Sequence, residues 1–213
     1  MIKIAISSII FSSLLFGCSL LYKHSNSLVF YDLNSQQSQN LLQQPLQQTQ
    51  LPKRNILISD ASAPPWLDNT AIYYRLAYHN SAQFHRYANS RWIASPAVLL
   101  SQKMRDRIAK ETGNQVIKNN NTAKADHILH IELEEFAQIF DSAQQSHALI
   151  GLRASLIKRN TRDVIAQNYF SVQAAAPSLD ANGAVAALSA ASDQLINKLI
   201  AWMIIELPND SLP

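Results

Sequence analysis

The sequence contains very little glycine and cysteine, and it has no marked excess of charge of either sign. Its 213 residues include four glycines, at positions 17, 113, 151 and 183, so no glycine-rich phosphate loop or dinucleotide fingerprint can be built. Cys18 is the only cysteine, which rules out a disulfide framework within the chain. The 18 Lys and Arg nearly balance 15 Asp and Glu, so the chain lacks the electrostatic footprint of a nucleic-acid-binding protein.

The histidines and carboxylates do not form a recognisable metal or catalytic set. His127 and His130 stand three apart in a stretch with a strand pattern, where such residues point to opposite faces. The adjacent Glu134 and Glu135 face apart for the same reason, and no serine stands in a G-x-S-x-G elbow. The sequence therefore predicts no metal site, no cofactor and no enzyme activity.

The beginning of the chain has the pattern of a bacterial lipoprotein signal peptide. Lys3 is followed by a short apolar stretch over 4–16, which is shorter than the ~20 residues that span a bilayer. Residues 15–18, Leu-Phe-Gly-Cys, then match a lipobox, which predicts removal of 1–17 and acylation of Cys18 with fatty acids such as palmitate. Ser19 in place of Asp predicts sorting to the outer membrane, facing the periplasm. The alternative is a plain anchor helix in which Cys18 is incidental.

The rest of the chain has the length and composition of one domain. Hydrophobic residues make up 47% of the sequence, which is enough to build a core. We divide it into a lipidated tether (18–27), the domain (28–207) and a carboxy-terminal tail (208–213). From Ser19 to Ser27 the tether reaches at most ~30 Å, which holds the domain close to the membrane. The glutamine-rich stretch 34–54 is expected to be a solvated loop, with a partner-binding arm as the alternative.

Strand and helix patterns follow one another in an order that predicts an α+β fold. Alternating and continuous apolar stretches predict strands, over 28–33, 55–59, 72–78, 84–93, 115–117, 127–140, 147–158 and 164–174. Strands 72–78 and 84–93 are expected to form a hairpin. Strands 127–140, 147–158 and 164–174 are expected to form a meander, with a bulge near Glu134-Glu135. Helices are expected over 96–111 and 181–206. The simplest packing is a two-layer sandwich, a mainly antiparallel sheet with two helices on one face.

Each expected helix has an apolar stripe and a capping residue at its start. In 96–111 the stripe is Ala97, Leu100, Met104 and Ile108, whereas Lys103, Arg105 and Lys110 are expected to face water. Ser95 and Asp180 precede the two helices and are typical capping residues. Asn197 and Lys198 interrupt the apolar residues of 181–206, so that helix is not a membrane span.

Aromatic and arginine side chains gather in the middle of the chain, and these residue types are enriched where proteins dock. The candidate partner-binding residues are Trp66, Tyr73, Tyr74, Arg75, Tyr87, Arg91 and Trp92. Ordinary core and corner packing explains them equally well, with Trp66 and Trp92 packed together under the start of helix 96–111. The sequence does not separate these two interpretations.

Several landmarks stand together in an order that resembles a known family. They are the lipobox, Phe30-Tyr31-Asp32-Leu33, Ala63-Pro64-Pro65-Trp66-Leu67-Asp68, Ile72-Tyr73-Tyr74-Arg75, Tyr87-Ala88-Asn89-Ser90-Arg91-Trp92, Ser95-Pro96, Ala125-Asp126, Glu134-Glu135-Phe136 and Trp202. The chain resembles the ABC-type transport auxiliary lipoproteins, the group that includes the paraquat-inducible protein C-like lipoproteins. The stretch 63–96 is the most specific part of the match, and the glutamine-rich stretch departs from a compact version of the pattern.

The resemblance implies a non-enzymatic outer-membrane lipoprotein with a small α/β sandwich domain. Such a protein partners a mammalian-cell-entry (MCE) domain protein fed by an inner-membrane ABC permease and ATPase, which together move lipids between membranes. It would dock the MCE protein at the outer membrane, and assembly as a homo-oligomer would suit that role. The alternative is an outer-membrane assembly lipoprotein that escorts or plugs a β-barrel, as in lipopolysaccharide export. The family brings no catalytic residues.

Overall fold

The structure is a computed structural model that describes residues 27–34, 55–112, 115–118 and 124–207. The predicted signal peptide, the acylation site Cys18, most of the tether and the glutamine-rich stretch beyond Asn34 therefore lie outside the described residues. So does Gly113, which follows the first long helix.

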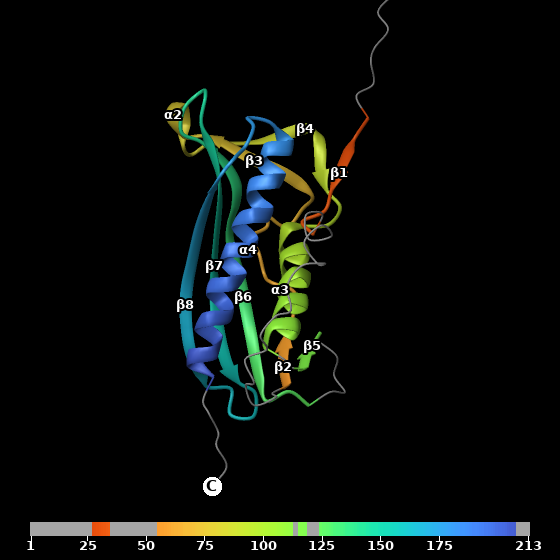
Figure 1. The fold of residues 1–213 in the computed structure, drawn as a ribbon, viewed down its shortest axis with the longest axis vertical. Helices are drawn as coiled ribbons and strands as arrows, with labels where there is room; N and C mark the ends of the chain where they lie inside the picture. Colours follow the sequence, from red (N-terminus) through yellow and green to blue (C-terminus); the bar gives the residue numbers. More distant parts are fainter. Residues whose placement is uncertain (1–26, 35–54, 113–114, 119–123, 208–213) are drawn as a thin grey trace, which may run out of the picture.

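Three long antiparallel strands form one half of the sheet (Figure 1). They are β6 (His127–Phe140), β7 (Ser146–Lys158) and β8 (Val164–Ala175), paired in that order as the predicted meander. Alternate residues of β7 from Ala148 to Leu156 are completely buried, as a strand with one face on the core requires. The predicted bulge is confirmed, because the β6–β7 register shifts between Leu133 and Glu135.

The other edge of β6 is shared by two shorter strands. Near its start β6 pairs in parallel with β2 (Asn55–Ile58), and near its end it pairs in parallel with β3 (Ala71–Leu76). A parallel bridge between Ser62 and Glu132 lies between the two. The long strand β6 therefore pairs with β2 along one half of this edge and with β3 along the other half.

Beyond β2 the sheet continues with one further strand, and beyond β3 it continues with two. β5 (Gln115–Ile117) pairs with β2, β4 (Phe84–Trp92) pairs with β3, and β1 (Val29–Tyr31) pairs with β4. The predicted β3–β4 hairpin is confirmed, and α2 (Ala77–Asn80) forms one helical turn between its strands. The parallel pairings are three residue pairs long each, so the sheet is mainly antiparallel, as predicted.

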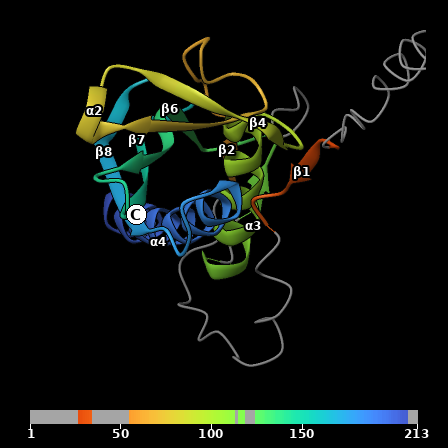
Figure 2. The same cartoon turned by 90° about the horizontal axis from the view of Figure 1, so that it is seen from above.

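Two long helices cover one face of the sheet, and no helix of the described residues covers the other (Figure 2). They are α3 (Pro96–Thr112) and α4 (Ala181–Glu206). Asp180 caps α4 by accepting a hydrogen bond from the Gly183 amide at 2.9 Å, as predicted. The apolar stripe of α4 is formed by Val185, Leu188, Leu195 and Leu199, which are buried. The half-buried Trp202 packs edge-on against Phe170 at 5.7 Å between ring centroids. Among the described helices, none is long and apolar enough to cross a membrane.

The predicted apolar stripe of α3 is confirmed, but the prediction that Lys103 faces water is wrong. Only 2% of Lys103 is exposed, because α4 packs against that side of α3. Its Nζ donates to Asp193 Oδ2 at 3.0 Å. Arg105 is also mostly covered, with 11% of its side chain exposed, and it pairs with Asp60 at 2.9 Å. Lys110 is exposed, as predicted.

Candidate docking surface

The predicted partner-binding residues lie on β3, β4 and the segment before β3, but they do not form one surface. Side chains alternate along β3, so Tyr73 and Arg75 lie on one face of the sheet and Tyr74 lies on the other. Tyr74 pairs with Gln138 and contacts Phe140, which places it on the side of the helices. Tyr73 and Arg75 therefore belong to the face without helices.

Trp66, Tyr73, Phe84, Arg75 and Glu135 gather on this face, and we call them the aromatic platform. The Trp66 ring lies 4.6 Å from Phe84 and 5.8 Å from Tyr73, measured between centroids, and Tyr73 meets Phe84 edge-on. Trp66 is 37% and Phe84 38% exposed, so the two rings present their outer surfaces to solvent. Such an exposed cluster of large aromatics has the composition of a docking site.

A single arginine ties the platform to the central strand. Arg75 of β3 donates to Glu135 Oε2 at 3.0 Å, and its guanidinium lies 4.9 Å from the centroid of the Phe84 ring. The arginine therefore combines an ion pair with a cation–π contact. Glu135 stands at the β6 bulge, so the irregular register places this carboxylate beside β3. The ion pair between Arg75 and Glu135 therefore links the aromatic platform to β6.

An asparagine holds the tryptophan in position. Asn69 Nδ2 donates to the Trp66 carbonyl at 2.7 Å and to the Tyr73 hydroxyl at 3.1 Å. The Asn69 side-chain oxygen also accepts from the Ala71 amide at the start of β3. These contacts connect the loop that carries Trp66 to the strand that carries Tyr73. The hydrogen bonds of this turn therefore hold Trp66 in place beside Tyr73.

Tyr74 and Tyr87 belong to a different group, on the helix side of the sheet. Their rings lie 4.8 Å apart, and the Tyr87 hydroxyl donates to Gln138 Oε1. Gln138 is completely buried and donates in turn to Ser146 Oγ at 2.8 Å. Burial raises the pKa of the Tyr87 hydroxyl well above its usual range, with smaller contributions from Tyr74 and Asp180. This chain of hydrogen bonds is internal and supports the fold.

The last two predicted residues do not contribute to the platform. Arg91 donates to the carbonyls of Tyr87 and Ser90, so its guanidinium is used by its own strand. Trp92 is 1% exposed and packs edge-on against Phe136 in the core. The predicted packing of Trp66 against Trp92 is wrong, because Trp66 packs against Tyr73 and Phe84 whereas Trp92 packs against Phe136 in the core. Phe84 was missed by the sequence prediction, although its alternation on β4 and its register opposite Arg75 mark it as a platform residue.

The sequence matches the family of ABC-type transport auxiliary lipoprotein components over residues 31–200. The chain belongs to this family. The auxiliary lipoprotein assignment makes it a component of an ABC-type transport system, in agreement with the resemblance predicted from its motifs. A comparison with curated proteins finds no match.

Solved structures support the fold of this auxiliary lipoprotein. Protein XCC0632 from Xanthomonas campestris superimposes with a TM-score of 0.69 at 20% identity, covering 78% of this chain and 93% of that chain. An uncharacterized protein superimposes with a TM-score of 0.62 at 12% identity, covering 83% of this chain and 99% of that chain. At these identities the similarity establishes the sandwich architecture alone.

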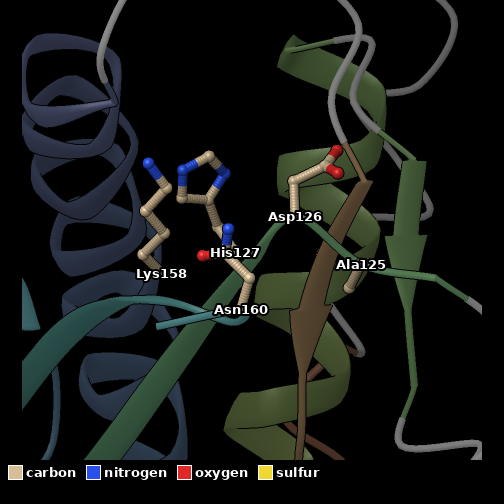
Figure 3. A pocket seen from close by; sticks show the side chains of 5 residues that line it. All are labelled: Ala125, Asp126, His127, Lys158 and Asn160. Atoms are coloured by element: carbon tan, nitrogen blue, oxygen red, sulfur yellow. The ribbon is translucent and has the colours of Figure 1, made fainter. Parts of the chain in front are cut away.

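This auxiliary lipoprotein also has a pocket of about 230 Å³ at the start of β6, far from the platform (Figure 3). The His127 ring and the Lys158 amine lie side by side in it, beside Asn160, whereas the Asp126 carboxylate points away toward β2. That carboxylate accepts from the Asn55 amide at 3.3 Å, which explains its direction. The described residues contain no group of three or more His, Cys, Asp or Glu that could hold a metal ion. The pocket was not predicted, and its lining residues include no serine, threonine or cysteine.

Proposed function

We propose that the chain is a non-enzymatic, outer-membrane-anchored component of an intermembrane lipid transport system. In this role it docks an MCE-domain protein at the outer membrane, where the protein receives lipid from an inner-membrane ABC permease and ATPase. The match of residues 31–200 to the auxiliary lipoprotein family carries the proposal, since an auxiliary component works with a transporter. The family description names no reaction.

Acylation of Cys18 supplies the anchor in this proposal. Two or three acyl chains hold a protein on a bilayer stably, whereas one chain gives only marginal binding. The lipobox over 15–18 supports this modification, and Ser19 supports the outer membrane as its destination. The domain then faces the periplasm, where a protein that spans from the inner membrane can reach it.

The aromatic platform is the surface that we assign to the MCE protein. It lies on the face of the sheet opposite α3 and α4, and Trp66 and Phe84 are its most exposed rings. Aromatic and arginine side chains dominate the energy of protein interfaces because they bury large areas and combine apolar contact with hydrogen bonding. Arg75 is held between Phe84 and Glu135, so little side-chain entropy remains to be lost when a partner covers it.

Co-purification with the MCE-domain protein of the same bacterium tests the docking role. We expect Trp66→Ala and Phe84→Ala to weaken the captured complex at least tenfold, since truncation of a central aromatic costs ~2 kcal/mol or more. Ile205→Ala is the control, because Ile205 is 79% exposed near the end of α4 and lies outside the platform.

The outcome separates the docking role from its alternatives. Equal losses of the captured complex for the platform variants and for Ile205→Ala would show that the platform is not the docking surface. Capture of an outer-membrane β-barrel protein in place of the MCE protein would favour the barrel-escort role predicted as the alternative. Loss of transport with an intact MCE complex after one polar substitution would argue for an enzyme.

A further inference from the structure

A second exposed apolar surface lies where the chain enters the domain. We give the name apolar corner to Leu28 and Phe30 of the β1 region and Ile93 after β4, which are 54%, 60% and 55% exposed. Val29 stands between the first two and points to the opposite face, with Tyr31. The Ile93 amide donates to the Tyr31 carbonyl at 2.9 Å, so the two segments lie side by side. Phe30 pairs with Arg91, two residues before Ile93, so Phe30 and Ile93 share one face of the sheet.

The fold itself does not require these exposed side chains. The residues that point to the opposite face already attach this corner to the domain. Tyr31 donates to Asn182 Oδ1 at 2.8 Å, and Trp92 is in the core. Leu33 follows and is completely buried. The outward positions could therefore be polar without loss of packing. Single exposed apolar residues are ordinary, but three large ones that share one face indicate a contact surface.

The corner is fixed rigidly to the helices. The Leu33 carbonyl accepts from Ser189 Oγ at 3.0 Å and from Lys103 Nζ at 3.4 Å. Lys103 belongs to α3 and Ser189 to α4, so both helices hold the end of the segment that carries β1. A contact made by the apolar corner therefore sets the orientation of the whole domain.

We propose that the apolar corner rests against the lipid bilayer that anchors the chain. The inference depends on the acylation of Cys18 stated in the proposed function. Between Cys18 and Leu28 stand residues 19–27, which span at most ~30 Å when fully extended. Of the described surfaces, the apolar corner is the one directly continuous with the tether. It therefore meets the membrane first, and its apolar side chains gain by leaving water there.

The backbone of β1 limits how deeply the corner can enter the bilayer. Among the described strands, β1 pairs only with β4, so its outer edge presents unpaired amide and carbonyl groups. Such groups are costly in the hydrocarbon region, where no water reaches them. The corner therefore sits at the level of the lipid headgroups, where side chains reach the acyl boundary and the strand edge stays hydrated.

This contact gives the domain a defined direction. β1 lies toward one end of the long axis, and α4 ends at the other (Figure 1). The 26 residues of α4 extend ~39 Å along this axis at 1.5 Å per residue. With the apolar corner on the membrane, the far ends of β8 and α4 project into the periplasm. The acyl chains and the corner then form two attachments that prevent free rotation about the tether.

Fluorescence quenching by brominated lipids tests the contact in the acylated protein. Phe30→Trp is placed in the full mature chain on phosphatidylethanolamine–phosphatidylglycerol vesicles, and the emission of the parent with its three tryptophans is subtracted. We expect the added emission to be quenched at least twofold by lipid brominated near the headgroup. Ile205→Trp is the control, since Ile205 is 79% exposed near the end of α4. Equal quenching at the two positions would overturn the proposal.

Vesicle flotation of the non-acylated chain supplies an independent test. The test uses the mature chain that carries Cys18→Ser. Adding Phe30→Ser and Ile93→Ser should lower its partition coefficient between vesicles and water about tenfold, because two large side chains are no longer buried in the membrane. Val164→Ser with Ile205→Ser, at 59% and 79% exposure, should leave it unchanged. Absence of parent binding, or equal losses in both variants, contradicts a bilayer contact.

Two further readouts separate this inference from other occupants and from the proposed function. If the Phe30→Ser, Ile93→Ser change abolishes self-association in light scattering and leaves vesicle binding unchanged, the corner contacts a second copy and the bilayer contact is wrong. Capture of the MCE protein by the acylated variant tests the docking role separately. Retained capture with failed quenching would overturn the bilayer contact alone, whereas failed capture with retained quenching would overturn the docking role alone.

Discussion

Lys103 of α3 and Asp193 of α4 form an ion pair of 3.0 Å in which the lysine side chain is 2% exposed and the carboxylate 38%. Asp193 also accepts from Arg107 at 3.1 Å, so it serves two cations. The remaining neighbours of the lysine amine are neutral, namely the Leu33 carbonyl and the Ser189 hydroxyl. Lys103 therefore depends on Asp193 for its charge partner, whereas Asp193 has a second cation in Arg107.

Removing the carboxylate should destabilise the protein more than removing the lysine. Asp193→Ala leaves a buried ammonium with neutral acceptors alone, and we expect a loss of ~3 kcal/mol. Lys103→Met keeps the buried stem, and Asp193 retains Arg107 and water, so we expect a loss of ~1 kcal/mol. Urea unfolding at pH 7 measures both values. A larger loss for Lys103→Met would contradict this unequal dependence.

Tyr87→Phe should destabilise the protein and change its stability at alkaline pH. The change leaves Gln138 Oε1 buried without the Tyr87 donor, which costs ~1–3 kcal/mol. The raised pKa of Tyr87 means that the unfolded chain ionises this group from about pH 10 while the folded chain keeps it neutral. The stability that this difference contributes is present below that pH and is lost as the pH rises further. Unfolding measured at pH 8 and pH 11 should show a smaller decrease for Tyr87→Phe than for the parent.

The two described glycines at close contacts should respond differently to alanine. A Cβ at Gly183 would lie 1.9 Å from the Ser178 carbonyl oxygen, a backbone atom next to the cap of α4, so we expect Gly183→Ala to cost ~3 kcal/mol. A Cβ at Gly151 would meet the Tyr169 hydroxyl at 2.5 Å, but this exposed side chain is free to turn away. Gly151→Ala should therefore cost below ~1 kcal/mol. Thermal unfolding compares the pair, and equal losses would contradict the clash at Ser178.

Cys18→Ser should abolish acylation, since the thiol is the site to which the lipid is attached. Metabolic labelling with radioactive palmitate measures this directly, and cell fractionation should show the variant released from the membrane. The control is Ser19→Ala, which keeps the cysteine and should keep the label. Persistent labelling of Cys18→Ser would mean that the lipoprotein prediction is wrong.

Much of the fold was predictable because it depends on local periodicity. The meander, the β3–β4 hairpin, the bulge at Glu134-Glu135 and the Asp180 cap each have a signal within a few residues. The apolar stripe of α3 was predictable for the same reason. Of the seven candidate docking residues, Trp66, Tyr73 and Arg75 meet on the platform, and alternation along β3 already separates Tyr74 from them.

The sequence by itself determined the positions of the strands and the two long helices and the family that the chain resembles. It did not predict the short helix α2, since 72–78 were expected to form one strand, and the lipid attachment at Cys18 stays a prediction. Spacings of two and 3.6 residues decide which side chains share a face, and they act within one element. The tertiary structure alone decided what each face meets. It buried Lys103 because α4 supplied Asp193, separated Trp66 from Trp92, and placed β2 and β3 on two halves of β6. Contacts between elements far apart in the chain depend on how whole faces pack, and no local spacing encodes that arrangement.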